Sequence, residues 1–190
     1  MKKTAPSCAE QLVLSKRILV LGSSGSGKTY FSRQLSNILG IEPIHLDAHL
    51  IRPGWVGMPQ AEWRRILASL IQKERWIMDG TYERTLDLRL PVADMVVVIE
   101  SPRLACFWRV IKRKLTVDDT HRLDAPPGQR LDRAFLRYIW RYPTVTRPAI
   151  FEGINQYGKD KSLIILKSPK ETGRFIAQVR AEATVISSQD

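Results

Sequence analysis

The apolar residues of the chain gather in short runs, each followed by a stretch long enough for a helix. Runs of four to six apolar residues bounded by polar or turn residues are typical of strands buried on both faces of a parallel sheet. Five such strands are predicted, at residues 17–21, 43–46, 75–78, 95–99 and 163–166. Six helices are predicted, at residues 28–39, 60–73, 103–115, 131–141, 145–156 and 172–182. This alternation predicts an α/β protein with a five-stranded parallel sheet in three α/β/α layers.

The domain boundaries follow from the same pattern. Residues 16–183 are predicted to form a single domain, and residues 1–15 and 184–190 to be flexible tails. The insertion between the fourth and fifth strands is too long for one crossover. Its polar part contains Pro126-Pro127-Gly128, and we expect a lid at about residues 114–130.

The charge and the cysteine content indicate which partners and which metal or disulfide sites to expect. The formal charge of +11 favours anionic partners such as nucleotides, nucleic acid or an acidic membrane surface. Cys8 and Cys106 have no neighbouring ligand at metal spacing, and none of the three histidines is placed to require a metal, so neither a zinc site nor a disulfide framework is expected. No run approaches the ~18 apolar residues that cross a bilayer. We therefore expect a soluble cytoplasmic protein without a membrane span.

The strongest motif follows the first predicted strand directly and opens the first predicted helix. It has the phosphate-binding pattern G-x-x-x-x-G-K-T and comprises Gly22, Ser23, Ser24, Gly25, Ser26, Gly27, Lys28 and Thr29. Glycines let successive backbone N–H groups face phosphate oxygens, the lysine neutralises the β and γ phosphates, and the threonine hydroxyl reaches Mg²⁺. ATP and Mg²⁺ are therefore the predicted ligands, and a P-loop NTPase fold is predicted.

The remaining motifs separate kinases from other P-loop proteins. The Asn-Lys-x-Asp element that reads guanine in GTPases is absent, and so is the strand ending in adjacent acidic residues that motor ATPases carry. The segment from Trp76 to Arg84 resembles the Asp-Gly-Phe-Pro-Arg signature of adenylate kinase, with one extra residue before the arginine. Pro102, Arg109 and Arg113 are similar to the proline and two arginines that follow strand four of that family. The resemblance implies that Arg109 lies against the adenine and that Arg113 contacts phosphates.

Most of the chain, from about residue 16 to 183, resembles the bacterial DNA topology modulation proteins, which are small adenylate-kinase-like P-loop proteins. The shared segments are His45-Leu-Asp47, Pro53-Gly54-Trp55, Trp76-Ile-Met-Asp79-Gly80-Thr81-Tyr82, Leu86-Asp-Leu-Arg89 and Arg130-Leu-Asp-Arg-Ala-Phe135. This resemblance implies a nucleoside-kinase-like fold with a lid. The segment after the second strand lacks the usual AMP-binding arrangement of adenylate kinases, so AMP is not assigned as the acceptor.

Each acidic candidate has a structural alternative. Asp79 ends a predicted strand where a carboxylate holds a Mg²⁺-bound water, but Asp-Gly is also a common turn. Asp47 is a candidate contact of Mg²⁺ or general base towards an acceptor hydroxyl, and equally a candidate helix cap.

The basic and aromatic candidates also allow two interpretations. We expect Arg84 to bind a phosphate through two hydrogen bonds. We expect Arg122, in the predicted lid, to contact the transferred phosphoryl group when the lid closes, although an arginine in a lid is equally a solvated charge. Four arginines at helical spacing predict a charged outer face, or a contact with nucleic acid or with the nucleotide in the closed state: Arg130, Arg133, Arg137 and Arg141. Trp55 and Trp63 are candidates for stacking on a planar acceptor or for burial in the core.

The leading hypothesis is thus a kinase of the adenylate-kinase type that transfers the γ-phosphate of ATP to a nucleotide or another small acceptor. Lys28, Arg84, Arg113 and Arg122 are predicted to offset charge on the phosphoryl group, while Thr29 and Asp79 hold Mg²⁺. An ATP-dependent regulatory protein that binds nucleic acid is the alternative, although no nucleic-acid-binding motif supports it. A switch ATPase without an acceptor is a third possibility. Oligomeric state is not predicted.

Overall fold

The computed structural model describes residues 6–52, 56–116 and 131–188. Its main sheet consists of β1 (Arg17–Gly22), β2 (Pro43–His45), β5 (Trp76–Asp79), β6 (Met95–Ile99) and β7 (Ser162–Leu166). All neighbouring strands are parallel, and their order is β2-β5-β1-β6-β7. The predicted five-stranded parallel sheet is therefore confirmed, with β1 at its centre.

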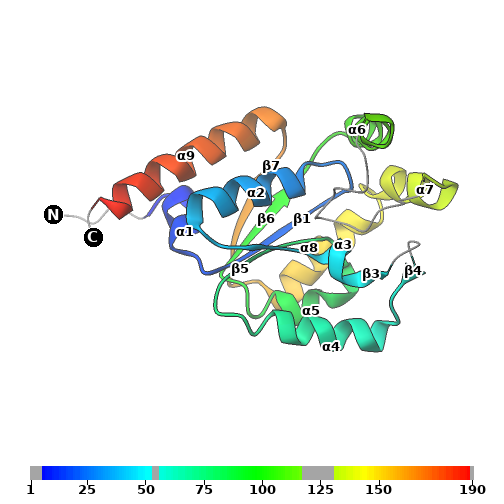
Figure 1. Ribbon diagram of the computed structural model, residues 1–190, viewed down its shortest axis with the longest axis horizontal. Coiled ribbons are helices and arrows are strands. Elements are labelled where there is room, and N and C mark those ends of the chain that lie inside the picture. Colours follow the sequence, from blue (N-terminus) through cyan, green and yellow to red (C-terminus); the bar gives the residue numbers. More distant parts are fainter. Residues whose placement is uncertain (1–5, 53–55, 117–130, 189–190) are drawn as a thin grey trace.

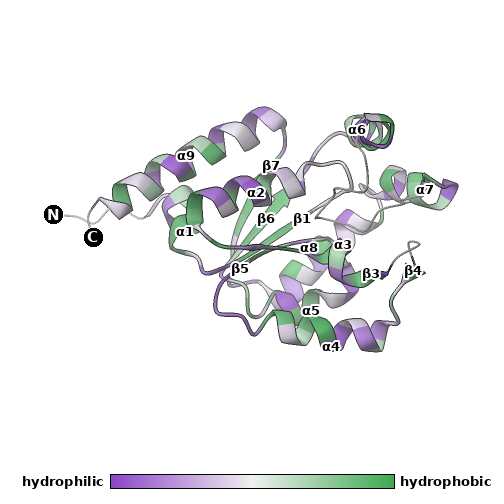
Figure 2. Ribbon diagram, viewed as in Figure 1, coloured by the Kyte–Doolittle hydropathy of each residue, from purple (hydrophilic) through white to green (hydrophobic). Residues whose placement is uncertain are grey.

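Helices cover both faces of this sheet (Figure 1). One face carries α1 (Cys8–Leu14), α2 (Lys28–Leu39) and α9 (Pro169–Ser187), and the other carries α4 (Gln60–Leu70), α5 (Leu86–Arg89) and α8 (Thr146–Tyr157). The central strand supplies both cores, because Leu19 and Leu21 point to the α4 side while Ile18 and Val20 point to the α9 side. Figure 2 shows the hydrophobic strands between helices that are hydrophobic on one side only.

Two further helices, α6 (Arg103–Thr116) and α7 (Arg133–Arg141), pack against each other beyond the carboxyl end of β6. Cys106, Val110 and Ile139 form a small buried cluster between them. Of the lid predicted at about residues 114–130, residues 114–116 continue α6, and residues 117–130 lie outside the described part of the chain.

Five short elements that follow β2 and β5 were not predicted. They are α3 (Leu46–Leu50), the antiparallel pair β3 (Ile51–Arg52) and β4 (Val56–Gly57), the 3₁₀-helix η1 (Glu83–Thr85) and α5. The second strand is one residue shorter than predicted, because Leu46 already begins α3. These elements bring polar residues from two strand ends towards the first helix.

The prediction of flexible tails is wrong for most of residues 6–15 and for residues 184–187. Cys8–Leu14 is helical, Ser7 caps it by accepting a hydrogen bond from the Glu10 amide, and Leu12 is completely buried against α9. The last helix begins at Pro169, capped by Ser168, and continues to Ser187. Among the described residues, no helix combines the length and apolar character needed to span a membrane.

Candidate functional site

The phosphate-binding loop lies between β1 and α2, as the sequence predicts. Gly27 is the N-cap residue of α2, and no side chain caps this helix end. The first N–H groups of α2 therefore keep their capacity to bind an anion, and the helix dipole places partial positive charge at the same point. The N-terminus of a helix with such N–H groups is a general binding site for a phosphate group.

Two glycines of the loop are required by both conformation and space. Gly22 and Gly25 have φ angles of 147° and 77°, which residues with a side chain rarely adopt. A Cβ at Gly22 would lie 2.3 Å from the carbonyl oxygen of Ile99, and one at Gly25 would lie 2.4 Å from that of Cys106. The loop is thus wedged against the end of β6 and the first turns of α6.

Lys28 is the central cation of the site. Its Nζ donates a hydrogen bond to the carbonyl oxygen of Ser23 at 2.8 Å, which folds the side chain back over the loop. Burial lowers the pKa of Lys28, and the negative charges of Asp47 and Asp79 partly offset this effect. The ammonium group of Lys28 has lost hydrating water through burial, and the oxygens of a bound phosphate would take the place of that water.

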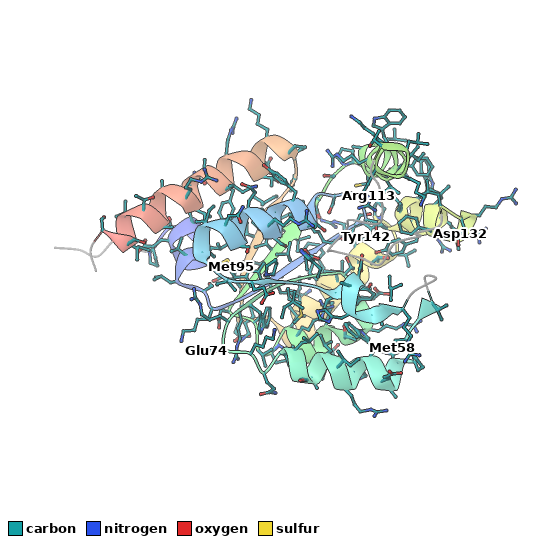
Figure 3. The ribbon with its side chains drawn as sticks, viewed as in Figure 1. Met58, Glu74, Met95, Arg113, Asp132 and Tyr142 are labelled. Atoms are coloured by element: carbon teal, nitrogen blue, oxygen red, sulfur yellow. The ribbon has the colours of Figure 1, made fainter. Side chains whose placement is uncertain are left out.

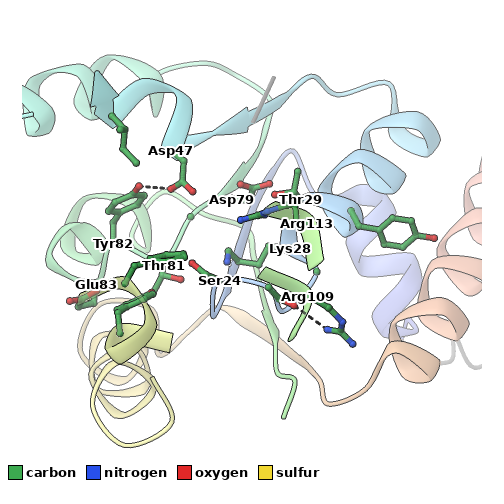
Figure 4. A pocket seen from close by; sticks show the side chains of 17 residues that line it. Ser24, Lys28, Thr29, Asp47, Asp79, Thr81, Tyr82, Glu83, Arg109 and Arg113 are labelled. Atoms are coloured by element: carbon green, nitrogen blue, oxygen red, sulfur yellow. Dashed lines mark hydrogen bonds between the residues drawn. The ribbon is translucent and has the colours of Figure 1, made fainter. Parts of the chain in front are cut away.

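A cavity of about 470 Å³ opens in front of the loop (Figure 4). The loop residues on its wall are Ser24, Gly25, Gly27, Lys28 and Thr29. Gly22, Ser23 and Ser26 were also predicted to bind the nucleotide, but their side chains or Cα atoms do not line this cavity. They shape the loop from behind, where both serines are buried.

Asp79 reaches the cavity from the end of β5, between two parallel neighbours, so it does not belong to a hairpin turn. Its Oδ2 is hydrogen-bonded to His45 Nδ1 at 2.7 Å, and both residues are buried. The β2–β5 register places His45 directly beside Asp79. His45 was not predicted to take part in the site, because the order of the strands is not evident from sequence.

Asp47 lies across the cavity from the loop. The N-cap of α3 is His45, so the alternative interpretation of Asp47 as a helix cap is wrong. Its Oδ1 accepts a hydrogen bond from the hydroxyl of Tyr82, and the carboxylate lines the cavity (Figure 4). Burial and the charge of Asp47 raise the pKa of Tyr82, so the phenol stays protonated and acts as a donor to the carboxylate.

The segment that carries Tyr82 is held from behind by Arg89. This arginine is completely buried and donates hydrogen bonds to the carbonyl oxygens of Gly80, Thr81 and Tyr82, at 2.6 to 2.9 Å. Tyr82 has a φ of 33°, which is uncommon for a residue with a side chain. The Arg89 contacts stabilise this conformation and thereby fix the direction of the Tyr82 ring.

The predicted arginines divide into two groups. Arg109 and Arg113 on α6 line the cavity, and Arg109 also donates to the carbonyl oxygen of Gly25 at 3.0 Å. Figure 3 shows Arg113 on the side of α6 that faces the body of the protein. Arg84 is exposed on η1 and does not line the cavity, so its predicted contact with a phosphate is not supported by its position. Arg122 lies outside the described residues.

The remaining residues that the sequence suggested as candidates lie in the core, on the surface or outside the described residues. Trp63 is buried in the core and meets the Tyr82 ring edge-on at 5.8 Å, so burial is its role. Arg133, Arg137 and Arg141 are exposed along α7, which confirms the charged outer face. Trp55 and Arg130 lie outside the described residues. Glu83, which sequence reasoning did not single out, lines the cavity next to Tyr82.

The residues on the cavity wall fit a magnesium ion. Thr29 offers a hydroxyl and Asp79 a carboxylate, and oxygen ligands of this kind suit Mg²⁺, which usually keeps waters and binds substrate phosphates as well. The described residues contain no group of three or more His, Cys, Asp or Glu placed to hold a metal ion alone. The donor set therefore suits a metal that arrives with a nucleotide.

Comparison with known proteins supports the fold. The chain matches a shikimate kinase from Acinetobacter baumannii, solved with shikimate, at a TM-score of 0.53 and 15% identity over 95% of this chain and 96% of that one. It also matches a sugar kinase from Janibacter sp. HTCC2649 at a TM-score of 0.53 and 17% identity, over 90% of this chain and 95% of that one. The chain has the P-loop kinase fold.

No protein-family model matches the chain. No curated protein matches it either. At identities of 15% and 17%, the structural matches support the fold and do not identify an acceptor.

Proposed function

We propose that the protein is a phosphotransferase that moves the γ-phosphoryl group of ATP to a hydroxyl group of a small molecule. The observation that carries this proposal is the position of Lys28 and Asp47 on the wall of one cavity (Figure 4). The first residue belongs to the phosphate-binding loop and the second stands where an acceptor would bind. Kinases on the same fold that act on shikimate and on sugars support the choice of reaction class.

The residues can be given roles in this reaction. The loop amides and Lys28 bind the β and γ phosphates, and Arg109 and Arg113 add positive charge from α6. Asp47 accepts the proton of the acceptor hydroxyl while the oxygen of that hydroxyl forms a bond to the γ-phosphorus. The bond between the γ-phosphorus and the bridging oxygen breaks at the same time, and ADP leaves. Mg²⁺, held by Thr29 and Asp79, would neutralise phosphate charge. His45 orients Asp79 through their buried hydrogen bond.

The test is transfer of label from γ-labelled ATP, in the presence of Mg²⁺, to a panel of nucleosides, nucleoside monophosphates, sugars and small hydroxylated metabolites. Lys28→Ala should abolish transfer, whereas Lys159→Ala, which removes an exposed lysine between α8 and β7, should leave it unchanged. Normal ATP turnover by Lys28→Ala would contradict the proposal. Slow hydrolysis that no acceptor accelerates would favour the switch ATPase.

Membership of the DNA topology modulation proteins is a second proposal, supported by the shared sequence segments. One structural observation is relevant to nucleic acid: α6 and α7 together carry eight lysines and arginines and no acidic residue, and several of these side chains are exposed. Phosphate contacts of such a surface would weaken steeply with salt. Duplex binding that falls with added salt and changes with ATP would support a nucleic-acid role, and undetectable binding at modest salt would remove it.

A further inference from the structure

Helix α6 has an apolar face that is exposed to solvent. Leu104, Trp108 and Leu115 lie at positions i, i+4 and i+11, which share one side of a helix, and they are 67%, 64% and 78% exposed. Ile111, at position i+7, is half-buried and continues the same row. We call these four residues the α6 stripe.

The packing of α6 on the protein uses other sides of the helix. Cys106 and Val110 are buried against α7, and Arg109 and Arg113 line the cavity. Figure 1 shows α6 and α7 together at one corner of the molecule. Large apolar side chains in a row on the outside of such a corner are typical of a surface that binds a partner or a membrane.

Exposed basic side chains accompany the α6 stripe. On α6 and α7 they include Arg103, Lys112, Arg133, Arg137 and Arg141, and neither helix contains Asp or Glu. The guanidinium group of Arg103 lies 4.6 Å from the centre of the Trp140 ring, and this tryptophan of α7 is 47% exposed. The two helices therefore present exposed apolar and basic side chains together.

A bilayer that contains anionic lipids matches both properties. A helix that lies in the surface of a membrane buries leucine and tryptophan at the boundary of the acyl chains, while lysine and arginine beside them contact lipid phosphates. The long stems of Lys and Arg let their charged groups stay at the headgroups while the leucines go deeper. Tryptophan is enriched at this interfacial depth.

Other occupants match only one of the two properties. The phosphates of a nucleic acid would contact the cations and a base would stack on Trp108, but Leu104 and Leu115 have no planar face for a base. A second copy of the chain would cover the leucines, but a symmetric contact would bring the same cations against each other.

We propose that the protein binds to the surface of anionic lipid bilayers through α6, with the α6 stripe among the lipids and the cations of α6 and α7 at the lipid phosphates. The proposal goes beyond the phosphotransferase function and does not depend on it. Surface binding of this kind needs no helix that spans the membrane.

The test is co-sedimentation of the full-length protein with vesicles of phosphatidylcholine, prepared with and without phosphatidylglycerol. We expect binding to the vesicles that contain phosphatidylglycerol, a decrease of this binding with added salt, and little binding to pure phosphatidylcholine. A protein that stays in the supernatant with the anionic vesicles would overturn the proposal. Equal binding to both kinds of vesicle would also overturn it.

A matched pair of leucine variants tests the role of the α6 stripe. Leu104→Ser should lower the partition coefficient for the anionic vesicles about tenfold, because the apolar side chain no longer enters the lipid. Leu14→Ser changes a leucine of similar exposure on α1 and should leave the coefficient unchanged. Both variants should bind the non-hydrolysable ATP analogue as the wild type does, which shows that they are folded. Equal partitioning of Leu104→Ser and the wild type would contradict insertion of this stripe.

The fluorescence of Trp108 tests the same placement without a binding constant. On addition of the anionic vesicles, the emission of the wild type should shift to shorter wavelength, since the exposed indole of Trp108 leaves water. Trp108→Phe should show a smaller shift while it still sediments with the vesicles. A shift of the same size in Trp108→Phe would overturn the placement of α6 against the bilayer.

Two further measurements distinguish the other occupants. Binding to duplex or single-stranded DNA without binding to the anionic vesicles would assign this surface to nucleic acid and overturn the proposal. A dimer in size-exclusion chromatography that Leu104→Ser converts to a monomer would assign the α6 stripe to a second copy of the chain, with the same consequence.

Discussion

At the scale of single residues, the buried ammonium group of Lys28 makes a prediction about pH. Burial lowers its pKa from the usual value for lysine, so the charge is lost at a lower pH than on an exposed lysine. The group is protonated below its pKa, and phosphate binding needs this proton. ATP affinity should therefore fall as the pH rises, and this fall should occur at a lower pH than the ordinary lysine pKa of about 10.4.

The measurement is the Kd of a non-hydrolysable ATP analogue between pH 6 and 10. Lys28→Arg is the matched variant, because a guanidinium group keeps its charge over this whole range. The affinity of Lys28→Arg for the analogue should be weaker than that of the wild type at neutral pH, but it should not fall as the pH rises. A fall of the same size and midpoint in both proteins would assign the titration to another group.

The residues of the site differ in how far sequence could predict them. Lys28 and Thr29 follow from one local motif, and the structure places both on the cavity wall. His45 enters the site only because β2 pairs with β5, and this pairing is a property of the assembled sheet. Glu83 lines the cavity instead of Arg84 because Tyr82 adopts a left-handed conformation just before them, and no motif specifies that turn.

At the scale of elements, the phosphate-binding loop depends on its contact with α6. A Cβ at Gly25 would meet the carbonyl oxygen of Cys106 at 2.4 Å, and helix backbone cannot give way as a side chain would. Gly25→Ala should therefore move the loop and weaken ATP binding by about tenfold or more, which corresponds to about 1.4 kcal/mol. Isothermal titration with the non-hydrolysable analogue measures this loss.

Gly40→Ala is the matched control for that substitution. Gly40 ends α2 with a φ of 63°, and a Cβ there would meet no atom within 4 Å. Alanine at this position introduces backbone strain of about 1 kcal/mol without a clash. Its ATP affinity should equal that of the wild type, and equal losses in both variants would show that flexibility of the backbone rather than the α6 contact decides binding.

Long elements were predicted well and short ones were missed. The boundaries of α2 and β6 agree with the sequence pattern, since both are strongly periodic or continuously apolar. The helix at Cys8–Leu14 buries only Ala9 and Leu12, which is too sparse a pattern to recognise, although Ser7 and Glu10 have the spacing of a helix cap. Short elements such as α3 and η1 are set by their neighbours and carry little periodicity of their own.

At the scale of the whole molecule, the first and last helices close one side of the sheet together. The contact of α1 with α9 joins segments from opposite ends of the chain (Figure 1). The candidate site lies at the carboxyl ends of the strands, with α6 and α7 beside it. Substitutions in the α1–α9 contact should therefore change stability and leave the cavity unaffected.

Leu12 and Leu14 provide a direct test of this separation. Leu12 is completely buried and Leu14 is 63% exposed, although both lie on the same short helix. Leu12→Ala should lower the free energy of unfolding by about 3 kcal/mol, because a buried leucine loses its contacts and leaves a cavity. Leu14→Ala should have little effect. Urea unfolding measures both, and the affinity for the ATP analogue should be the same in both variants. A loss of nucleotide binding in folded Leu12→Ala would instead show that the terminal helices are coupled to the site through the sheet.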